Sequence, residues 1–362
     1  MGVQESIKEL EERIANTKYN KRTQSAIGTY KAQLSKLRDD VVKRASKGPA
    51  TSGYAVKKSG DATVVILGFP SVGKSTVLNA ITGAKSAVAA YEFTTLTVIP
   101  GVMKYKGANI QILDLPGIVH GAASGRGRGR EVLAVIRSAD LILILIEGKK
   151  PEHYQAIRKE VYDVGIRLNE KQPIIKIKKT SKDGIKIGRT VKTDLDDETI
   201  KSVLREFKVN NADVVLRSNA NIDQFIDAVE GNRLYLPAIA AVSKADVLNE
   251  EQIEKINKQL HPDLFISAQE NINIDRLKEL IFDKLELMRI YMKEIGKDAD
   301  MEEPLIIKNG SKIQDVCNKL HKDFVTKFKF VRVWGPSSKF PGQKFMLDHV
   351  LKDKDVVEIH LR

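Results

Sequence analysis

The stretch GFPSVGKST, residues 68–76, constrains the fold of this 362-residue chain more than any other feature. It directly follows the apolar run ATVVIL and matches G-x-x-x-x-G-K-[S/T], a glycine-rich turn that joins a buried strand to a helix. The glycines let the backbone wrap around phosphate groups, and the helix N-terminus stabilises their charge. We therefore expect a nucleotide site with Lys74 on the β- and γ-phosphates and the Ser75 hydroxyl on Mg²⁺. The loop residues expected to contact the nucleotide are Gly68, Phe69, Pro70, Ser71, Val72, Gly73, Lys74, Ser75 and Thr76.

Two later segments follow in the order that a sensor of the γ-phosphate requires. In YEFTTL, Thr94 and Thr95 offer a second hydroxyl to the metal, and we favour Thr95. In LDLPG, Asp114 ends an apolar run and is expected on the outer side of the metal, while the Gly117 amide faces the γ-phosphate. Lys74, Thr95 and Gly117 are therefore the predicted catalytic residues.

The segment VSKAD, residues 242–246, predicts which base is bound. The Asp246 carboxylate can accept two hydrogen bonds from N1 and N2 of guanine, whereas adenine would leave this charge unpaired. Lys244 is expected to lie along the base, and Ser243 to brace the base-binding segment and the phosphate loop. Ser267 and Ala268 follow the next apolar run, so the Ala268 amide can meet the guanine carbonyl.

One expected group is absent from the switch segment ILDLPGIVHGAASGRGRGRE. Many GTPases place a water-orienting glutamine shortly after the Asp-x-x-Gly motif, but Ile118 follows Gly117 here. Something else must stabilise the charge that develops between the β- and γ-phosphates. The candidates are a K⁺ ion held by Ser71, one of the arginines, His120 as a base, and a group from a partner; the arginine segment could instead face solvent, a partner or RNA. The three arginines are Arg126, Arg128 and Arg130.

Strand-like and helix-like stretches alternate after residue 61, which predicts an α/β fold with a mainly parallel sheet and helices on both faces. A basic stretch that contains IIKIKKTSKDGIKIG breaks this rhythm and predicts a small α+β insertion. The last part predicts a compact β-grasp-like module with Cys317 as a packing residue and Trp334 either in its core or exposed for stacking. The predicted boundaries are 1–58 for a helical hairpin arm and linker, 59–164 and 236–292 for the nucleotide domain, 165–235 for the insertion, and 293–362 for the final module.

The first 45 residues carry two apolar stripes at helical spacing, separated by a polar stretch. One stripe contains Ile7, Leu10 and Ile14, and the other begins at Ile27 and Tyr30. We therefore expect a helical hairpin, either a solvated coiled-coil-like arm or an arm that contacts RNA or the ribosome.

Composition narrows the cellular setting. The chain has 60 Lys and Arg against 47 Asp and Glu, a formal charge of +13 that favours RNA or another polyanion as a partner. A single cysteine excludes a disulfide framework and favours a reducing cytoplasmic location. No apolar run is long enough for a membrane span, and the match of MGVQES to a myristoylation pattern is weak because the pattern is short.

The ordered set of motifs is that of translation-factor-class GTPases, and GFPSVGKST, YEFTTLTVIPGV, ILDLPGI and GRGRGRE closely resemble the developmentally regulated GTP-binding (DRG) branch of the Obg-related GTPases. This resemblance covers essentially the whole chain. It implies an N-terminal helical segment, a P-loop GTPase domain with a ribosomal-protein-like α+β insertion, and a C-terminal TGS domain. It also implies slow GTP hydrolysis, stimulation by K⁺, and association with ribosomes or translation. Eukaryotic members of the family also work with dedicated regulatory partner proteins, so such a partner is possible here. We expect a monomer.

Two positions depart from related GTPases. Ser243 stands where many have asparagine, which predicts weaker nucleotide affinity without a change to ATP. Ser71 stands where K⁺-dependent relatives often have asparagine, and its hydroxyl oxygen must replace the carboxamide if K⁺ binds. The leading hypothesis is a Mg²⁺-dependent, ribosome-associated translation GTPase, contacting rRNA or tRNA. The alternatives are a ribosome-assembly GTPase, an adaptor in which GTP is a structural ligand, and an RNA-binding module.

Overall fold

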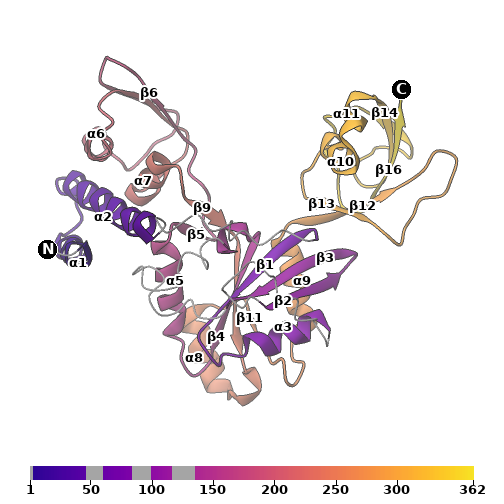
Figure 1. Ribbon diagram of the computed structural model, residues 1–362, viewed down its shortest axis with the longest axis horizontal. Coiled ribbons are helices and arrows are strands. Elements are labelled where there is room, and N and C mark those ends of the chain that lie inside the picture. The colour runs from indigo at the N-terminus through magenta and orange to yellow at the C-terminus, as the bar shows by residue number, and fades with distance from the viewer. Residues whose placement is uncertain (1–2, 46–59, 84–98, 116–134) are drawn as a thin grey trace. The chain divides into compact units, whose positions relative to one another are not determined.

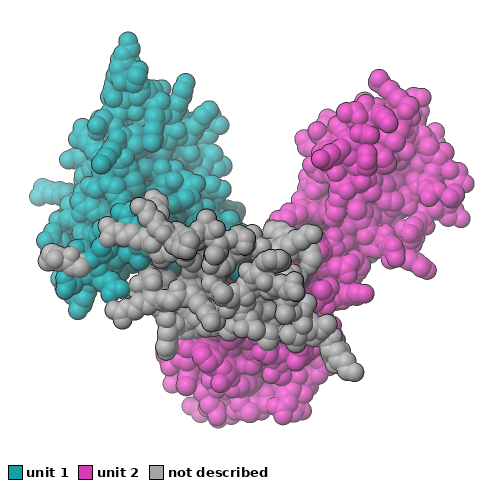
Figure 2. Space-filling model, in the orientation of Figure 1, with its two compact units in different colours: residues 1–54, 117–137, 154–236 teal, residues 55–116, 138–153, 237–362 magenta. Residues whose placement is uncertain are grey.

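The computed structural model describes residues 3–45, 60–83, 99–115 and 135–362. The chain divides into two compact units, shown in teal and magenta in Figure 2. Unit 1 consists of Met1–Tyr54, Gly117–Arg137 and Tyr154–Leu236, and unit 2 of Ala55–Pro116, Ser138–His153 and Pro237–Arg362.

Unit 2 contains a six-stranded sheet in the order β11-β10-β4-β1-β3-β2 (Figure 1). Its strands β1, β3, β4, β10 and β11 are parallel, as expected, and the antiparallel β2 was not anticipated. The turn Lys106–Gly107, with φ of 48° and 82°, lets β2 fold directly back on β3. The strands are β1 (Ala62–Leu67), β2 (Ile99–Tyr105), β3 (Ala108–Asp114), β4 (Leu141–Glu147), β10 (Ala238–Ser243) and β11 (Leu264–Phe265).

The central strands are buried along nearly their whole length, which is typical of a parallel sheet covered on both faces. All six residues of β1 and all six of β10 are buried. Helices α3 (Lys74–Thr82) and α9 (Ile274–Lys284) contribute side chains to the same core, and α8 (Glu250–Leu260) follows a short 3₁₀ turn, η1 (Ala245–Val247). The predicted P-loop α/β architecture is therefore confirmed.

The C-terminal part of unit 2 forms a separate five-stranded sheet in the order β13-β12-β16-β14-β15. Cys317 is fully buried beside Val316 and Val331, so its predicted packing role is confirmed. The elements are β12 (Leu287–Met292), β13 (Leu305–Lys308), α10 (Ile313–Leu320), α11 (Lys322–Thr326), β14 (Phe328–Trp334), β15 (Gln343–Phe345) and β16 (Asp355–Leu361).

The sequence left open whether Trp334 lies in the core or is exposed for stacking, and the structure places it between these two alternatives. It is half-buried, at a position of β14 that alternates with the core residues Val331 and Val333. The Lys293 ammonium lies 5.1 Å from its ring centroid, and a Cβ on Gly342 would approach its indole to 3.2 Å. The indole is therefore packed against its own module.

Unit 1 contains the N-terminal helices, a three-stranded sheet in the order β6-β8-β7, and a two-stranded sheet of β5 and β9. Helices α6 and α7 bury Ile200, Val203 and Phe225 against one face of the three-stranded sheet. The elements are α1 (Val3–Asn16), α2 (Gln24–Ala45), α5 (His153–Asp163), β5 (Ile166–Leu168), β6 (Ile175–Lys179), β7 (Ile185–Arg189), α6 (Asp197–Glu206), β8 (Ala212–Leu216), α7 (Ile222–Glu230) and β9 (Leu234–Leu236).

The helical hairpin forms as predicted, but it is not a solvated arm. Ile27 and Ala32 of α2 are buried in the same hydrophobic cluster as Ile200 and Phe225 of the insertion. The Lys31 ammonium also pairs with Asp223 of α7 at 2.6 Å. The apolar stripe of α2 thus serves to bind the insertion, because burying such a stripe stabilises both partners.

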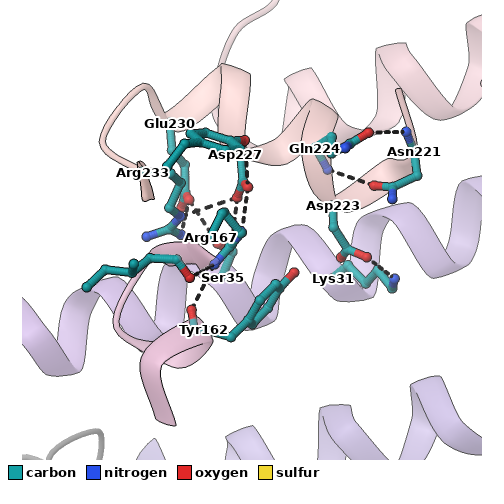
Figure 3. Close-up of polar contacts among 12 residues, drawn as sticks. Lys31, Ser35, Tyr162, Arg167, Asn221, Asp223, Gln224, Asp227, Glu230 and Arg233 are labelled. Carbon is teal, nitrogen blue, oxygen red and sulfur yellow. Dashed lines mark hydrogen bonds and ion pairs between the residues drawn. The ribbon is translucent and has the colours of Figure 1, made fainter. Parts of the chain in front are cut away.

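A buried ionic network joins α2, β5 and α7 within unit 1 (Figure 3). Arg167, on β5, donates two hydrogen bonds of 2.7 Å to Asp227, and its guanidinium lies 3.6 Å from the ring centroid of Tyr162. Arg233 pairs with Asp39 at 2.7 Å and with Glu230. Bidentate geometry offsets the desolvation of Arg167 and Asp227. The Arg233–Asp39 pair is the member of the network that links α2 to the insertion.

Among the described residues, no helix combines the length and the apolar composition needed to cross a lipid bilayer.

Candidate nucleotide-binding site

The phosphate loop leaves β1 and ends at the first residue of α3. Gly68 is required here, because a Cβ would lie 2.8 Å from the Val72 side chain and 2.9 Å from the Leu145 carbonyl oxygen. Gly73 has φ of 94° and Ser71 has φ of 63°, so the chain turns through the left-handed region twice. This tight turn directs the first backbone amides of α3 toward the loop interior, where an anion can bind.

The Lys74 side chain folds back over the phosphate loop. Its ammonium donates hydrogen bonds to the carbonyl oxygens of Gly68 at 3.1 Å and Phe69 at 3.3 Å. The Phe69 ring stacks on His153, with centroids 3.7 Å apart and planes 15° apart. The positive charge is thus held at the mouth of the loop, close to where phosphates would lie.

Ser75 and Asp114 are brought together although 39 positions separate them in the sequence. The Ser75 hydroxyl donates to Asp114 Oδ2 at 2.9 Å, at the point where β3 ends. Asp114 is 5% exposed, and its Oδ1 finds no hydrogen-bond donor among the residues described. A buried carboxylate oxygen without a partner is costly, and a hydroxyl beside a carboxylate is a suitable oxygen donor set for Mg²⁺. These residues therefore fit a divalent cation.

Ser243 joins the base-binding segment to the phosphate loop. It is buried at the end of β10, and its hydroxyl lies 2.8 Å from the Val72 carbonyl oxygen and 3.3 Å from that of Ile146. The hydroxyl thus makes the bracing contact expected from the sequence.

The remaining residues that are predicted to bind the base lie at the same edge of the sheet. Lys244 has φ of 57°, and its ammonium lies 3.3 Å from the carboxylate of Glu147. Asp246 is exposed in η1, where its carboxylate is available to a ligand. Ser267 is buried and accepts the Glu270 amide hydrogen at 3.2 Å, whereas the Ala268 amide has no protein acceptor within the described ranges.

Three predicted residues lie outside the described part of the chain. These are Thr94, Thr95 and Gly117, and the same holds for the switch positions Ile118, His120, Arg126, Arg128 and Arg130. Their roles stay predictions. Ser71, the predicted oxygen donor to K⁺, is exposed at the tip of the phosphate loop.

The described site residues lie at or just after the carboxyl ends of five strands, β1, β3, β4, β10 and β11. β1 lies between β3 and β4, so the chain crosses from one side of β1 to the other. Ligands of open α/β sheets bind at such a switch point. Sequence reasoning missed Glu147 and His153; Glu147 had a usable signal, because it directly follows the apolar run LILILI.

Comparisons with known proteins agree with this geometry. A protein-family model described as a 50S ribosome-binding GTPase matches residues 63–179, and one for the C-terminal region of the same domain matches residues 182–287. A TGS domain model matches residues 288–361. A GTP-binding protein of Methanocaldococcus jannaschii is 49% identical over 367 residues, covering 100% of this chain and 94% of that protein. Developmentally-regulated GTP-binding protein 1 of Xenopus laevis is 46% identical over 363 residues, with 99% of both chains covered.

The chain belongs to the developmentally regulated GTP-binding protein family.

As a DRG-family member, this GTP-binding protein carries a P-loop GTPase domain and a C-terminal TGS domain. Full-length similarity to a Dictyostelium discoideum DRG protein, 45% identical with 99% of both chains covered, places the whole chain in the family. The solved YchF GTPase of Schizosaccharomyces pombe aligns with 84% of this chain and 99% of its own at 15% identity and a TM-score of 0.36, so the DRG assignment rests on the sequence relatives.

Proposed function

We propose that this protein binds Mg-GTP at the edge of the six-stranded sheet and hydrolyses it to GDP and phosphate. The observation that carries the proposal is the buried Oδ1 of Asp114, left without a protein donor in the described structure beside the Ser75 hydroxyl. A metal ion would satisfy this oxygen where the phosphate loop meets β3.

Each group of the phosphate side has a defined task in this proposal. Lys74 exchanges its two carbonyl contacts for the β- and γ-phosphate oxygens, and the first amides of α3 bind the same phosphates. Ser75, Asp114 and Thr95 would hold Mg²⁺, with Thr94 as the neighbouring hydroxyl. The ion, when bound, supplies positive charge that offsets the charge developing on the phosphates. The Gly117 amide would meet the γ-phosphate.

The base side gives specificity for guanine. The exposed Asp246 carboxylate accepts from N1 and N2, and the unpaired Ala268 amide donates to the guanine carbonyl. Glu147 holds the Lys244 ammonium, which keeps the lysine stem against the base. ATP offers neither donor to Asp246, so discrimination follows from the cost of an unpaired carboxylate.

We further propose that a K⁺ ion replaces the missing glutamine, with the exposed Ser71 hydroxyl among its ligands. The test is the initial rate of phosphate release from Mg-GTP in KCl and in NaCl at equal ionic strength. Marked stimulation by K⁺ supports the ion, and Ser71→Ala should then remove most of that stimulation. Equal rates near zero in both salts reject the ion and assign the missing group to a partner or the ribosome.

We propose a cytoplasmic, ribosome-associated role in translation. The net charge of +13 and the family model named for 50S-binding GTPases support it, as does the TGS domain. Sedimentation of the full chain with ribosomes, in GDP and in a non-hydrolysable GTP analogue, tests the association. Binding without any hydrolysis, even with ribosomes and K⁺, would favour the adaptor alternative. Preference for subunit precursors would favour ribosome assembly.

A further inference from the structure

The three-stranded sheet of the insertion has one covered and one open face. Ile177, Ile187 and Val214 point toward the hydrophobic cluster formed with α6 and α7. Because side chains alternate along a strand, the residues between them lie on the opposite face. The open face carries Lys176 and Lys178 of β6, Asp213 and Val215 of β8, Lys186 and Gly188 of β7, and Arg217 just after β8.

The register places these residues in two rows across the sheet. One row is Lys178, Asp213 and Lys186, and the other is Lys176, Val215 and Gly188. Arg217 extends the alternation beyond the second row, next to Ile174, whose carbonyl accepts its backbone amide at 2.8 Å. Four cations therefore surround one carboxylate on a single surface.

These cations are not consumed by ion pairs. Within the described residues, the side chains of Lys176, Lys178 and Arg217 have no carboxylate within 4.0 Å, and Asp213 pairs with neither lysine in its row. Lys186 reaches only Asp183, at 3.7 Å, in an exposed pair that contributes little. The face thus keeps an excess of positive charge toward solvent.

Val215 on the central strand and Gly188 beside it on the edge strand β7 allow a close approach. Gly188 has no side chain, and a Cβ placed on it would meet only the Val214 carbonyl oxygen, at 3.9 Å. Val215 beside it is half-buried. The long lysine and arginine side chains therefore flank a low, uncharged pair of residues, Val215 and Gly188, that a polyanion can approach.

We propose that this open face, comprising Lys176, Lys178, Lys186 and Arg217 around Gly188 and Val215, binds the sugar–phosphate backbone of RNA. The occupant follows from charge complementarity, since three unpaired cations and one weakly paired lysine on an open sheet face match the phosphates of a backbone. No aromatic side chain lies on the face, so contact is with the backbone rather than with stacked bases. The inference deepens the proposed association with ribosomes. It rests on that proposal only for the identity of the RNA as ribosomal, not for the binding of RNA by this face.

The test compares two triple variants of the full chain with the same net charge. Lys176→Gln/Lys178→Gln/Lys186→Gln removes three cations from the open face. Lys201→Gln/Arg205→Gln/Lys208→Gln removes three cations from the helical side of the same insertion, two on α6 and one just after it. Binding of a labelled RNA duplex of about 20 base pairs is titrated at salt concentrations from about 50 to 200 mM.

We expect the open-face variant to bind at least about tenfold more weakly, with a salt slope reduced by about two to three. The helical-side variant should keep the affinity and slope of the unmodified chain, and both variants should keep its thermal midpoint and GTP hydrolysis. The proposal is overturned if the duplex does not bind, if both variants lose affinity equally, or if the open-face variant binds normally. Equal displacement of the duplex by polyglutamate would assign the face to an acidic protein and also overturn it.

Sedimentation with ribosomes separates this inference from the proposed function. If the unmodified chain binds duplex RNA through this face but does not sediment with ribosomes, the ribosome proposal fails and the inference stands. If the open-face variant binds both duplex and ribosomes normally, the inference fails and the ribosome proposal stands.

Discussion

The hydroxyl of Ser243 lies 2.8 Å from the carbonyl oxygen of Val72, which ties the base-binding segment directly to the phosphate loop. Ser243 ends β10 and Val72 precedes the left-handed Gly73, so the contact joins the end of a strand to the phosphate loop across 171 positions. The same hydroxyl lies 3.3 Å from the Ile146 carbonyl oxygen, at the end of β4. The segment proposed to recognise the base is therefore coupled to the shape of the phosphate loop through one buried oxygen.

Ser243→Ala should weaken GTP binding without changing base preference. The substitution removes one buried hydrogen bond, a loss of about 0.5–1.5 kcal/mol, so Kd should rise by at most about tenfold. Asp246 is untouched, so ATP should still fail to compete. A fluorescent GTP analogue measures both constants. An unchanged Kd, or a gain in ATP binding, would show that the Ser243–Val72 contact does not shape the site.

Asp114→Asn should have opposite effects on the nucleotide-free and the loaded protein. Without nucleotide, removal of a buried charge whose Oδ1 has no donor in the described structure should leave the thermal midpoint unchanged or raise it. With Mg-GTP, the variant should lose most of the stabilisation that the ligand gives, because the metal loses its carboxylate. Thermal unfolding with Mg-GTP and with GTP plus chelator measures both. The control is Asp263→Asn, which also replaces a carboxylate; Asp263 accepts the backbone amide hydrogen of Ala240 in the sheet. This variant should keep its Mg²⁺-dependent stabilisation.

The conformation of the phosphate loop could be predicted from the sequence because its determinants are local. Gly68, Gly73 and Lys74 lie within seven positions, and a strand, a turn and a helix N-terminus suffice to define their geometry. The pairing of Ser75 with Asp114 followed from the order of motifs. Glu147 was missed although it directly follows the apolar run LILILI, because its contact with Lys244 depends on the register of β4 beside β10.

The packing of the helical hairpin shows what the sequence could not predict, namely the partner of an apolar helix face. The stripe that begins at Ile27 indicated that α2 has an apolar face but not what covers it. Its partners, Ile200 and Phe225, lie more than 170 positions later. Arg167 likewise reads as an ordinary surface residue until Asp227, 60 positions away, is placed beside it. Contacts between residues far apart in the sequence, rather than local secondary-structure propensity, determine both the packing of α2 and the pairing of Arg167.

Glu230 should make unit 1 less stable as the pH rises toward neutrality. Burial raises the pKa of Glu230 to about 7, although the adjacent Arg233 guanidinium opposes the shift. The unfolded chain has the ordinary, lower pKa, so the native state binds more protons between about pH 4.5 and 7. This stabilising contribution is complete below that window and is lost as the pH rises through about 7.

Glu230→Gln should flatten this pH dependence. The difference in unfolding free energy between pH 5 and pH 8 should shrink by at most about 3 kcal/mol relative to the unmodified chain. Chemical denaturation at both pH values, followed by circular dichroism, measures it. Glu254→Gln on the exposed face of α8 is the matched control and should leave the pH dependence as it is. Equal slopes for all three proteins would contradict the assignment to Glu230.

Asp246→Asn should change the preferred base from guanine to xanthine. The carboxylate accepts from N1 and N2 of guanine, whereas the asparagine carboxamide accepts from N1 but donates from its nitrogen. Guanine would then meet a donor opposite its own N2 donor, while xanthine presents a carbonyl oxygen there. Loss of a hydrogen bond to a charged group costs about 1.5–3 kcal/mol, so GTP binding should weaken by about tenfold to about 150-fold and XTP binding should exceed it.

Competition of GTP and XTP for the variant, with phosphate release from each, measures the change in base preference. Because Ser243 and Lys74 are unchanged, XTP should be hydrolysed at a rate close to that of GTP on the unmodified chain. A variant that still prefers GTP would place the base elsewhere than beside Asp246.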